Sequence, residues 1–162
     1  MESSTSPEET PKPSPFFPDR LLRLTPDFGI AQSIFSRGLG LIYLIAIWSW
    51  WTQIDGLIGS NGIIPAASYV EFVKENVEGS AIWNAPSLFM ITGASDSTLH
   101  GVCFLGMALS ILVFAGLLQG PLLLLLWVIY LSLSQVGGVF MGFQWDALLL
   151  EAGLLATLFA PP

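Results

Sequence analysis

Charged residues are scarce in this 162-residue sequence, and the scarcity excludes several classes of protein. Only 10% of the residues are charged and only five are Lys or Arg, against roughly 25% charged residues in soluble globular domains. So few basic residues exclude a nucleic-acid-binding surface. Histidine and cysteine each occur once, as His100 and Cys103, so neither an internal disulfide nor a Cys/His metal cluster can form.

Recognisable catalytic and cofactor motifs are also missing. The sequence has no phosphate-cradling glycine loop followed by Lys, and no serine-centred nucleophile elbow. We therefore expect no metal and no cofactor, and we expect the protein not to be an enzyme.

Apolar residues, in contrast, are abundant. They make up 53% of the chain, and the mean hydropathy is +0.70. They occur in long blocks separated by polar segments, as in proteins whose helices cross a bilayer. The sequence therefore predicts an all-α, polytopic transmembrane helical protein with three to four membrane helices.

The N-terminal segment, residues 1–24, differs in composition from the rest. It is rich in Pro, Ser and Glu and has no apolar run, which predicts a disordered tail and excludes a cleavable signal peptide at the very N-terminus. Pro26 suits the start of a short interfacial helix. Four of the five basic residues precede the first apolar block, and this places the N-terminus and the tail in the cytoplasm. They are Lys12, Arg20, Arg23 and Arg37.

Residues 25–162 form the predicted transmembrane domain. The first apolar run ends in three tryptophans typical of a membrane interface, and a tight Gln-Gly-Pro connection turns the second and third runs into a hairpin. The last run is short enough to cross the membrane, re-enter it or lie in it. The predicted membrane helices cover about residues 36–57, 99–118, 122–142 and 145–160.

The first loop, residues 59–97, lies on the non-cytoplasmic or lumenal side by this count. Its segment "PAASYVEFVKENVEG" has apolar residues on one helical face and charged residues on the other. This pattern predicts an amphipathic helix at the membrane interface, and a partner-binding groove is the weaker alternative.

Small residues recur four positions apart in two of the apolar runs. Such spacing lets another helix pack closely, within the chain or in a homo-oligomer. The predicted packing residues are Gly106 and Ser110 in the second run, and Ser134, Gly138 and Gly142 in the third.

Two carboxylates interrupt the closing segment "GFQWDALLLEAGLLATLFAPP". Asp146 suits the N-terminus of a helix, beside Trp145 at the interface, whereas Glu151 lies deeper. On a helix these two side chains are separated by about 140°. The spacing therefore disfavours a carboxylate pair for acid/base chemistry.

Three blocks of the sequence resemble the N-terminal membrane region of the lipase maturation factor family, and the resemblance covers about residues 33–162. The blocks are "QIDGLIGSNGIIPAASYV", "APSLF" and "LWVIYLSLSQVGGVFMGFQWDALLLEAGLLATLFAPP". Within them, the resemblance makes seven residues candidates for client binding or for a structural motif. These are Asn61, Gly62, Pro65, Gln144, Trp145, Asp146 and Glu151.

The resemblance implies a non-enzymatic assembly factor of the endoplasmic reticulum membrane. Family members assist secreted lipases of the lipoprotein lipase group to fold and to form active homodimers, so the implied partners are membrane lipids and a lipase client. They also continue well beyond the closing block, and we expect this chain to be truncated relative to them.

Three alternatives stay open at this stage. The first is an inner-membrane protein of a bacterium with an unknown client. The second is a membrane-embedded enzyme distantly similar to vitamin K-dependent carboxylase relatives, with His100 beside Asp96 on one helix as its base. The third is a transporter or channel subunit, which would need more polar residues within its spans.

Overall fold

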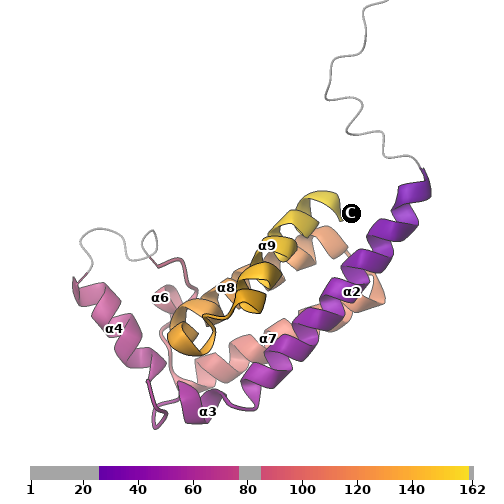
Figure 1. The fold of residues 1–162 in the computed structure, drawn as a ribbon. Helices are drawn as coiled ribbons and strands as arrows, with labels where there is room; N and C mark the ends of the chain where they lie inside the picture. Colours follow the sequence, from indigo (N-terminus) through magenta and orange to yellow (C-terminus); the bar gives the residue numbers. More distant parts are fainter. Residues whose placement is uncertain (1–25, 77–84, 161–162) are drawn as a thin grey trace, which may run out of the picture.

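The computed structural model describes residues 26–76 and 85–160, and this part of the chain contains helices and turns but no strand (Figure 1). The predicted all-α fold class is confirmed. The predicted tail, residues 1–24, lies outside the described residues. The helices are α2 (Pro26–Trp51), α3 (Ile54–Leu57), α4 (Ala66–Asn76), α6 (Phe89–Thr92), α7 (Asp96–Ala115), α8 (Gln119–Gly137), a 3₁₀ turn η1 (Gly138–Phe140) and α9 (Gln144–Phe159).

Three of these helices are long and apolar enough to cross a membrane. The stretches that qualify are Gly29–Trp51, Asp96–Ala115 and Gln119–Phe140. The closing helix α9 has 16 residues, and at 1.5 Å per residue it is about 24 Å long. That is less than the roughly 30 Å of a hydrocarbon core.

The first long helix differs from its prediction at both ends. The expected interfacial helix and the first span form one continuous helix, α2, which ends at Trp51 rather than near Leu57. The side chains of Thr52 and Gln53 both donate hydrogen bonds to the backbone oxygen of Ser49, at 2.8 and 3.1 Å. These local bonds compete with the helical pattern, and the chain then resumes as the short α3.

Helices α2 and α7 pack side by side and run antiparallel (Figure 1). Trp51 at the end of α2 contacts His100 near the start of α7, whereas the Arg37 guanidinium lies beside Gly116 at the end of α7. We call the end of the bundle at Trp51 and Asp96 the loop end, and the end at Gly116–Leu118 the hairpin end.

The hairpin between α7 and α8 depends on a glycine. Gly116 has a φ of +91° in the left-handed region, and its N–H bonds back to Leu112 and Val113, a common way for a helix to end. Leu118 also has a positive φ, of 39°, and α8 begins directly after it. The tight connection predicted at Gln-Gly-Pro, residues 119–121, is therefore made by the three residues before Gln119.

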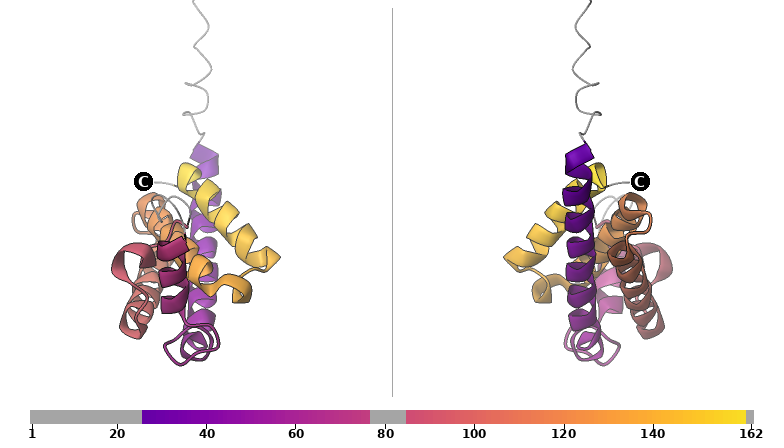
Figure 2. Two further views of the ribbon diagram at one scale, coloured as in Figure 1. Left: turned by 90° about the vertical axis from the view of Figure 1, so that its left-hand side faces the viewer. Right: turned by 90° about the vertical axis from the view of Figure 1, so that its right-hand side faces the viewer.

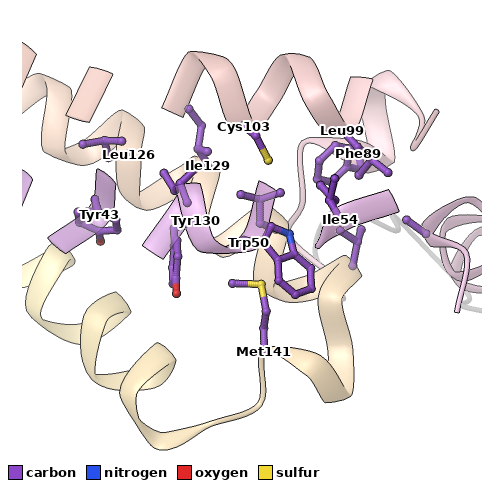
Figure 3. Packing of buried hydrophobic residues seen from close by; sticks show 14 of the residues in the cluster. Tyr43, Trp50, Ile54, Phe89, Leu99, Cys103, Leu126, Ile129, Tyr130 and Met141 are labelled. Carbon is purple, nitrogen blue, oxygen red and sulfur yellow. The ribbon is translucent and has the colours of Figure 1, made fainter. Parts of the chain in front are cut away.

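The three long helices meet at a second glycine, in the buried core shown in Figure 3. A Cβ atom added to Gly106 would lie 2.8 Å from Cδ1 of Ile47 on α2 and 3.2 Å from Cγ2 of Ile129 on α8. One turn further on, the buried Ser110 hydroxyl donates to the Gly106 carbonyl at 2.8 Å. Gly106 thus sets the close approach of all three helices.

The predicted packing residues of the third run are placed differently. Gly138 ends α8 with a φ of +47° and is exposed, and Gly142 lies beyond the 3₁₀ turn and is also exposed. Ser134, Gly138 and Gly142 therefore do not share a helical face, and this part of the packing prediction is wrong. Gly137 makes the close contact instead, since a Cβ there would lie 3.0 Å from Met141 and 3.1 Å from Trp50.

The amphipathic helix α4 packs on the loop end of the bundle. Its buried residues Ala66, Val70 and Val73 face the contacts with α6 and α8, whereas Phe72 is 62% exposed. Leu88, next to α6, donates its N–H to the Ser132 hydroxyl at 2.9 Å. This bond anchors the "APSLF" block to α8.

Candidate functional site

The closing helix α9 does not begin at the loop end of the bundle. It begins further along the bundle, toward the hairpin end. It packs against α8, and its last residues lie near Gly120 and Pro121 at the hairpin end. Asp146, in its first turn, is hydrogen-bonded to Tyr130, which lies seven residues before the end of α8. Seven residues correspond to about 10 Å of helix, so α9 begins beside a part of α8 that lies before its end.

The Asp146 carboxylate is the centre of the candidate site. It is 5% exposed, and its Oδ1 accepts a hydrogen bond from the Tyr130 hydroxyl at 2.6 Å. This distance lies in the range of about 2.5–2.7 Å typical of hydroxyl bonds to a charged oxygen. Asp146 lies in the first turn of α9, at the helix N-terminus where the sequence predicts it.

A second tyrosine extends this arrangement toward α2. Tyr43 is fully buried and packs edge to face on Tyr130, with ring centroids 5.5 Å apart. Its hydroxyl donates to the backbone oxygen of Leu149 at 3.2 Å. Figure 3 shows both tyrosine hydroxyls directed toward α9. The two tyrosines therefore fasten α9 to α2 and α8.

Gly153 makes room for this contact. A Cβ atom at this position would overlap the Tyr43 hydroxyl, so only glycine fits without a shift of α9 or of the Tyr43 side chain. Gly153 and the two tyrosines are not among the site residues predicted from the sequence. The available signal was a glycine inside an apolar helix, which is unfavourable for helix stability and often marks close packing.

The other predicted residues of the closing block have different surroundings. Trp145 is 66% exposed, and Gln144 and Glu151 are exposed as well. Asp146 is buried, so the two carboxylates of the block face different environments. The structure does not bring Glu151 into the Tyr43–Tyr130–Asp146 arrangement.

Asp146 lines a cavity that lies beside an apolar groove between α2 and α9. The cavity has a volume of about 330 Å³ and the groove about 500 Å³. The two spaces are adjacent, since four residues line both: Ala46, Ser49, Tyr130 and Trp145.

The loop end carries a second polar arrangement, around His100. The indole N–H of Trp51 donates to Nδ1 at 2.8 Å, and Nε2 lies 2.8 Å from Oδ1 of Asp55. An indole nitrogen only donates, so Nδ1 is the acceptor and Nε2 carries the proton that Asp55 accepts. Both ring nitrogens are engaged, and His100 contacts Asp55 rather than Asp96.

Asp96 instead holds the turn that contains the predicted loop residues. Its Oδ1 accepts the backbone N–H of Ser60 at 2.8 Å, and its Oδ2 accepts the Ser60 hydroxyl at 2.6 Å. A Cβ atom at Gly62 would lie 2.9 Å from backbone atoms of the same turn. Asn61 is exposed at its tip and Pro65 is half-buried.

The predicted site residues thus fall into two groups. Asn61, Gly62 and Pro65 belong to the turn at the loop end, and Asp146 belongs to the cavity within the bundle; among the described residues no hydrogen bond joins the two groups. Within residues 26–76 and 85–160, no three His, Cys, Asp or Glu side chains gather closely enough to hold a metal ion.

Comparison with known proteins gives a consistent result. Residues 30–162 match the family described as the lipase maturation factor transmembrane domain. The chain is 44% identical over 140 residues to lipase maturation factor 2 of Xenopus tropicalis, covering 82% of this chain and 19% of that protein. It is 36% identical over 138 residues to lipase maturation factor 2 of Homo sapiens, with coverage of 82% and 19%.

A more distant relative is lipase maturation factor 1 of Bos taurus, 29% identical over 141 residues, covering 83% of this chain and 25% of that protein. No solved structure matches the chain. The chain therefore spans about a fifth of the length of the first of these relatives.

Proposed function

The chain belongs to the lipase maturation factor family, and from this premise we propose that it forms the membrane-embedded part of a factor that assists secreted lipases to fold and dimerise. The observation that carries the proposal is the family match over residues 30–162. The three long apolar helices agree with an integral membrane protein. The proposed partners are membrane lipids and a secreted lipase.

The loop end is the proposed side of client contact. Its turn is held by two bonds from Ser60 to Asp96, so Asn61 is presented on a fixed backbone. Three large apolar side chains nearby in the sequence are exposed: Ile63 at 73%, Ile64 at 45% and Phe72 at 62%. Exposed apolar side chains on an ordered surface suit the binding of a partly folded client.

We place the loop end in the lumen of the endoplasmic reticulum and the hairpin end in the cytoplasm. Arg37 lies at the hairpin end, beside the C-terminus of α7, and retention of basic residues on the cytoplasmic side favours this orientation. Because Cys103 is buried, Asn61→Cys and Leu118→Cys can each report one side. A membrane-impermeant maleimide should label Asn61→Cys only from the lumen and Leu118→Cys only from the cytoplasm; the opposite pattern would refute the orientation.

The proposed activity is not enzymatic. The enzyme alternative depends on His100 as a base, but both of its ring nitrogens are already engaged by Trp51 and Asp55. A general base needs a free lone pair directed at the substrate. The geometry of this residue therefore favours a structural role, in which it joins the α2–α3 junction to α7.

A domain exchange tests the proposed function. Residues 30–162 of this chain replace the matching segment of lipase maturation factor 2 from Xenopus tropicalis. In cells that lack their own factor, we expect the chimera to restore the active lipase secreted into the medium, and the 162-residue chain alone to restore none. A correctly localised chimera with no effect on any secreted lipase would refute the proposal.

A second variant of the chimera tests the loop end as the client contact surface separately from folding. We expect the chimera with Asn61→Ala, Ile63→Ser and Phe72→Ser to insert and accumulate normally, because these side chains are exposed. It should nevertheless secrete less active lipase. Unchanged secretion would refute the loop end as the contact surface and leave the family role intact.

A further inference from the structure

An open groove lined mostly by apolar side chains lies between helices α2 and α9. Figure 2 shows α9 close to α2 near the hairpin end and diverging from it toward the loop end. The groove of about 500 Å³ and the cavity of about 330 Å³ both lie within the range of about 300–1,000 Å³ common for ligand sites. The groove is lined mainly by Phe35, Leu39, Ile42, Ile45, Leu148 and Leu149.

The cavity beside the groove is more polar, and Asp146 is the one acidic or basic side chain among the described residues that line it. Asp146 lines the cavity together with the neutral Ser49 and Gln53, and no Lys, Arg or His is among the lining residues. Tyr130 occupies one position on Oδ1, but each carboxylate oxygen accepts up to two hydrogen bonds. Asp146 can therefore accept further hydrogen bonds. A phosphate group at this position would be repelled by the negative charge of the carboxylate.

The depth of this carboxylate restricts the ligand further. Tyr130, which binds it, lies about 10 Å along the helix axis from the end of α8, whereas the charged headgroups of phospholipids occupy the surface of the hydrocarbon core. Away from the headgroups, a small uncharged group that donates a hydrogen bond therefore suits Asp146 better than a phosphate does. A free glycerol hydroxyl meets these conditions, and acyl chains suit the apolar groove between α2 and α9.

We propose that the groove between α2 and α9 is a binding site for a neutral glycerolipid with a free hydroxyl, such as a diacylglycerol. The hydroxyl donates to Asp146, and one acyl chain lies between Phe35 on α2 and Ala152 on α9. This site is independent of the proposed client role, which lies at the loop end.

The test uses the full chain, purified in a mild detergent, and a diacylglycerol with a photoactivatable diazirine in one acyl chain. We expect labelling to map to α2 and α9. Unlabelled diacylglycerol should compete at least tenfold better than phosphatidic acid with the same acyl chains, because the two differ only in the phosphate. Equal competition would overturn the proposed recognition of the hydroxyl, and labelling spread evenly over all helices would overturn the site.

Two matched variants test the groove itself. Ala152 lines the groove and Ala147 lies on an exposed face of the same helix. We expect Ala152→Trp to reduce labelling at least tenfold and Ala147→Trp to leave it within a factor of two. Equal labelling of the two variants would overturn the site. If Ala152→Trp does not fold, the competition between the two lipids on the unaltered chain decides the proposal.

A third variant tests the carboxylate. Asp146→Leu removes the charge and the acceptor, so diacylglycerol and phosphatidic acid should then compete within a factor of two of each other. A preference for diacylglycerol that survived this substitution would show that another group recognises the hydroxyl.

Discussion

The hydrogen bond between Tyr130 and Asp146 provides the sharpest test of how α9 is held. Tyr130→Phe keeps the ring and its edge-to-face contact with Tyr43 but removes the hydroxyl that donates to the carboxylate. Asp146 is 5% exposed, so the substitution leaves a buried acceptor without this donor. The cost then includes the desolvation of the carboxylate and not only the lost bond.

The expected magnitude depends on whether the carboxylate is charged. Hydrogen bonds to charged groups contribute about 1.5–3 kcal/mol, whereas bonds between neutral side chains in membrane proteins average about 0.6 kcal/mol. The 2.6 Å separation of the two oxygens is typical of a charge-assisted bond. We therefore expect Tyr130→Phe to lower the free energy of unfolding by about 1.5–3 kcal/mol.

A double-mutant cycle measures this interaction directly. Asp146→Leu replaces the carboxylate by an apolar group, and removing both partners of a buried bond is often nearly neutral. We expect the Tyr130→Phe, Asp146→Leu double variant to be more stable than Tyr130→Phe alone. The assay is loss of helical circular dichroism as dodecyl sulfate is titrated into mixed micelles.

The reasoning fails if the double variant is no more stable than Tyr130→Phe. It also fails if Tyr130→Phe changes the free energy of unfolding by less than about 0.5 kcal/mol, because solvent would then satisfy the carboxylate as well as the tyrosine does. A coupling near 0.6 kcal/mol would indicate a neutral carboxyl group.

Three further substitutions test the close contacts between helices. Gly153→Ala should destabilise the chain by about 1–3 kcal/mol because its Cβ overlaps the Tyr43 hydroxyl, and Tyr43→Phe should restore part of the loss; no recovery would count against the overlap. Gly106→Val should cost a similar amount in the same unfolding assay, and an unchanged midpoint would contradict the three-helix contact. Ser132→Ala should cost about 1 kcal/mol and speed hydrogen exchange at the Leu88 amide, which donates to that hydroxyl; unchanged exchange would refute the anchor.

The sequence predicts the helical class and the long apolar helices because both depend on composition and on run length alone. Helix ends were harder to predict. The end of α8 depends on the positive φ of Gly138. Four-residue spacing does not reveal this φ, so a regular series of small residues predicts a helical face that the chain does not form. The end of α2 depends on side-chain bonds from Thr52 and Gln53 to a single carbonyl.

The partners of the polar residues could not be read from the sequence either. Asp96 lies one helical turn from His100, yet their hydrogen bonds go to Ser60 and Asp55, which are 36 and 45 residues away. Local spacing shows which side chains could meet on one helix. It does not show which side chains another helix brings closer.

The depth of Asp146 and the shortness of α9 have one physical origin. The chain leaves α8 at Gly138 and turns back through the 3₁₀ turn, so α9 begins near the level of Tyr130 rather than at the loop end. From that level about 16 Å of α8 remains to its first residue, Gln119, and α9 is about 24 Å long. An inclined helix of this length therefore reaches Gly120 and Pro121 without spanning the full membrane thickness. The same geometry buries the Asp146 carboxylate beside Tyr130, and a buried carboxylate is stabilised by such a hydrogen-bond donor.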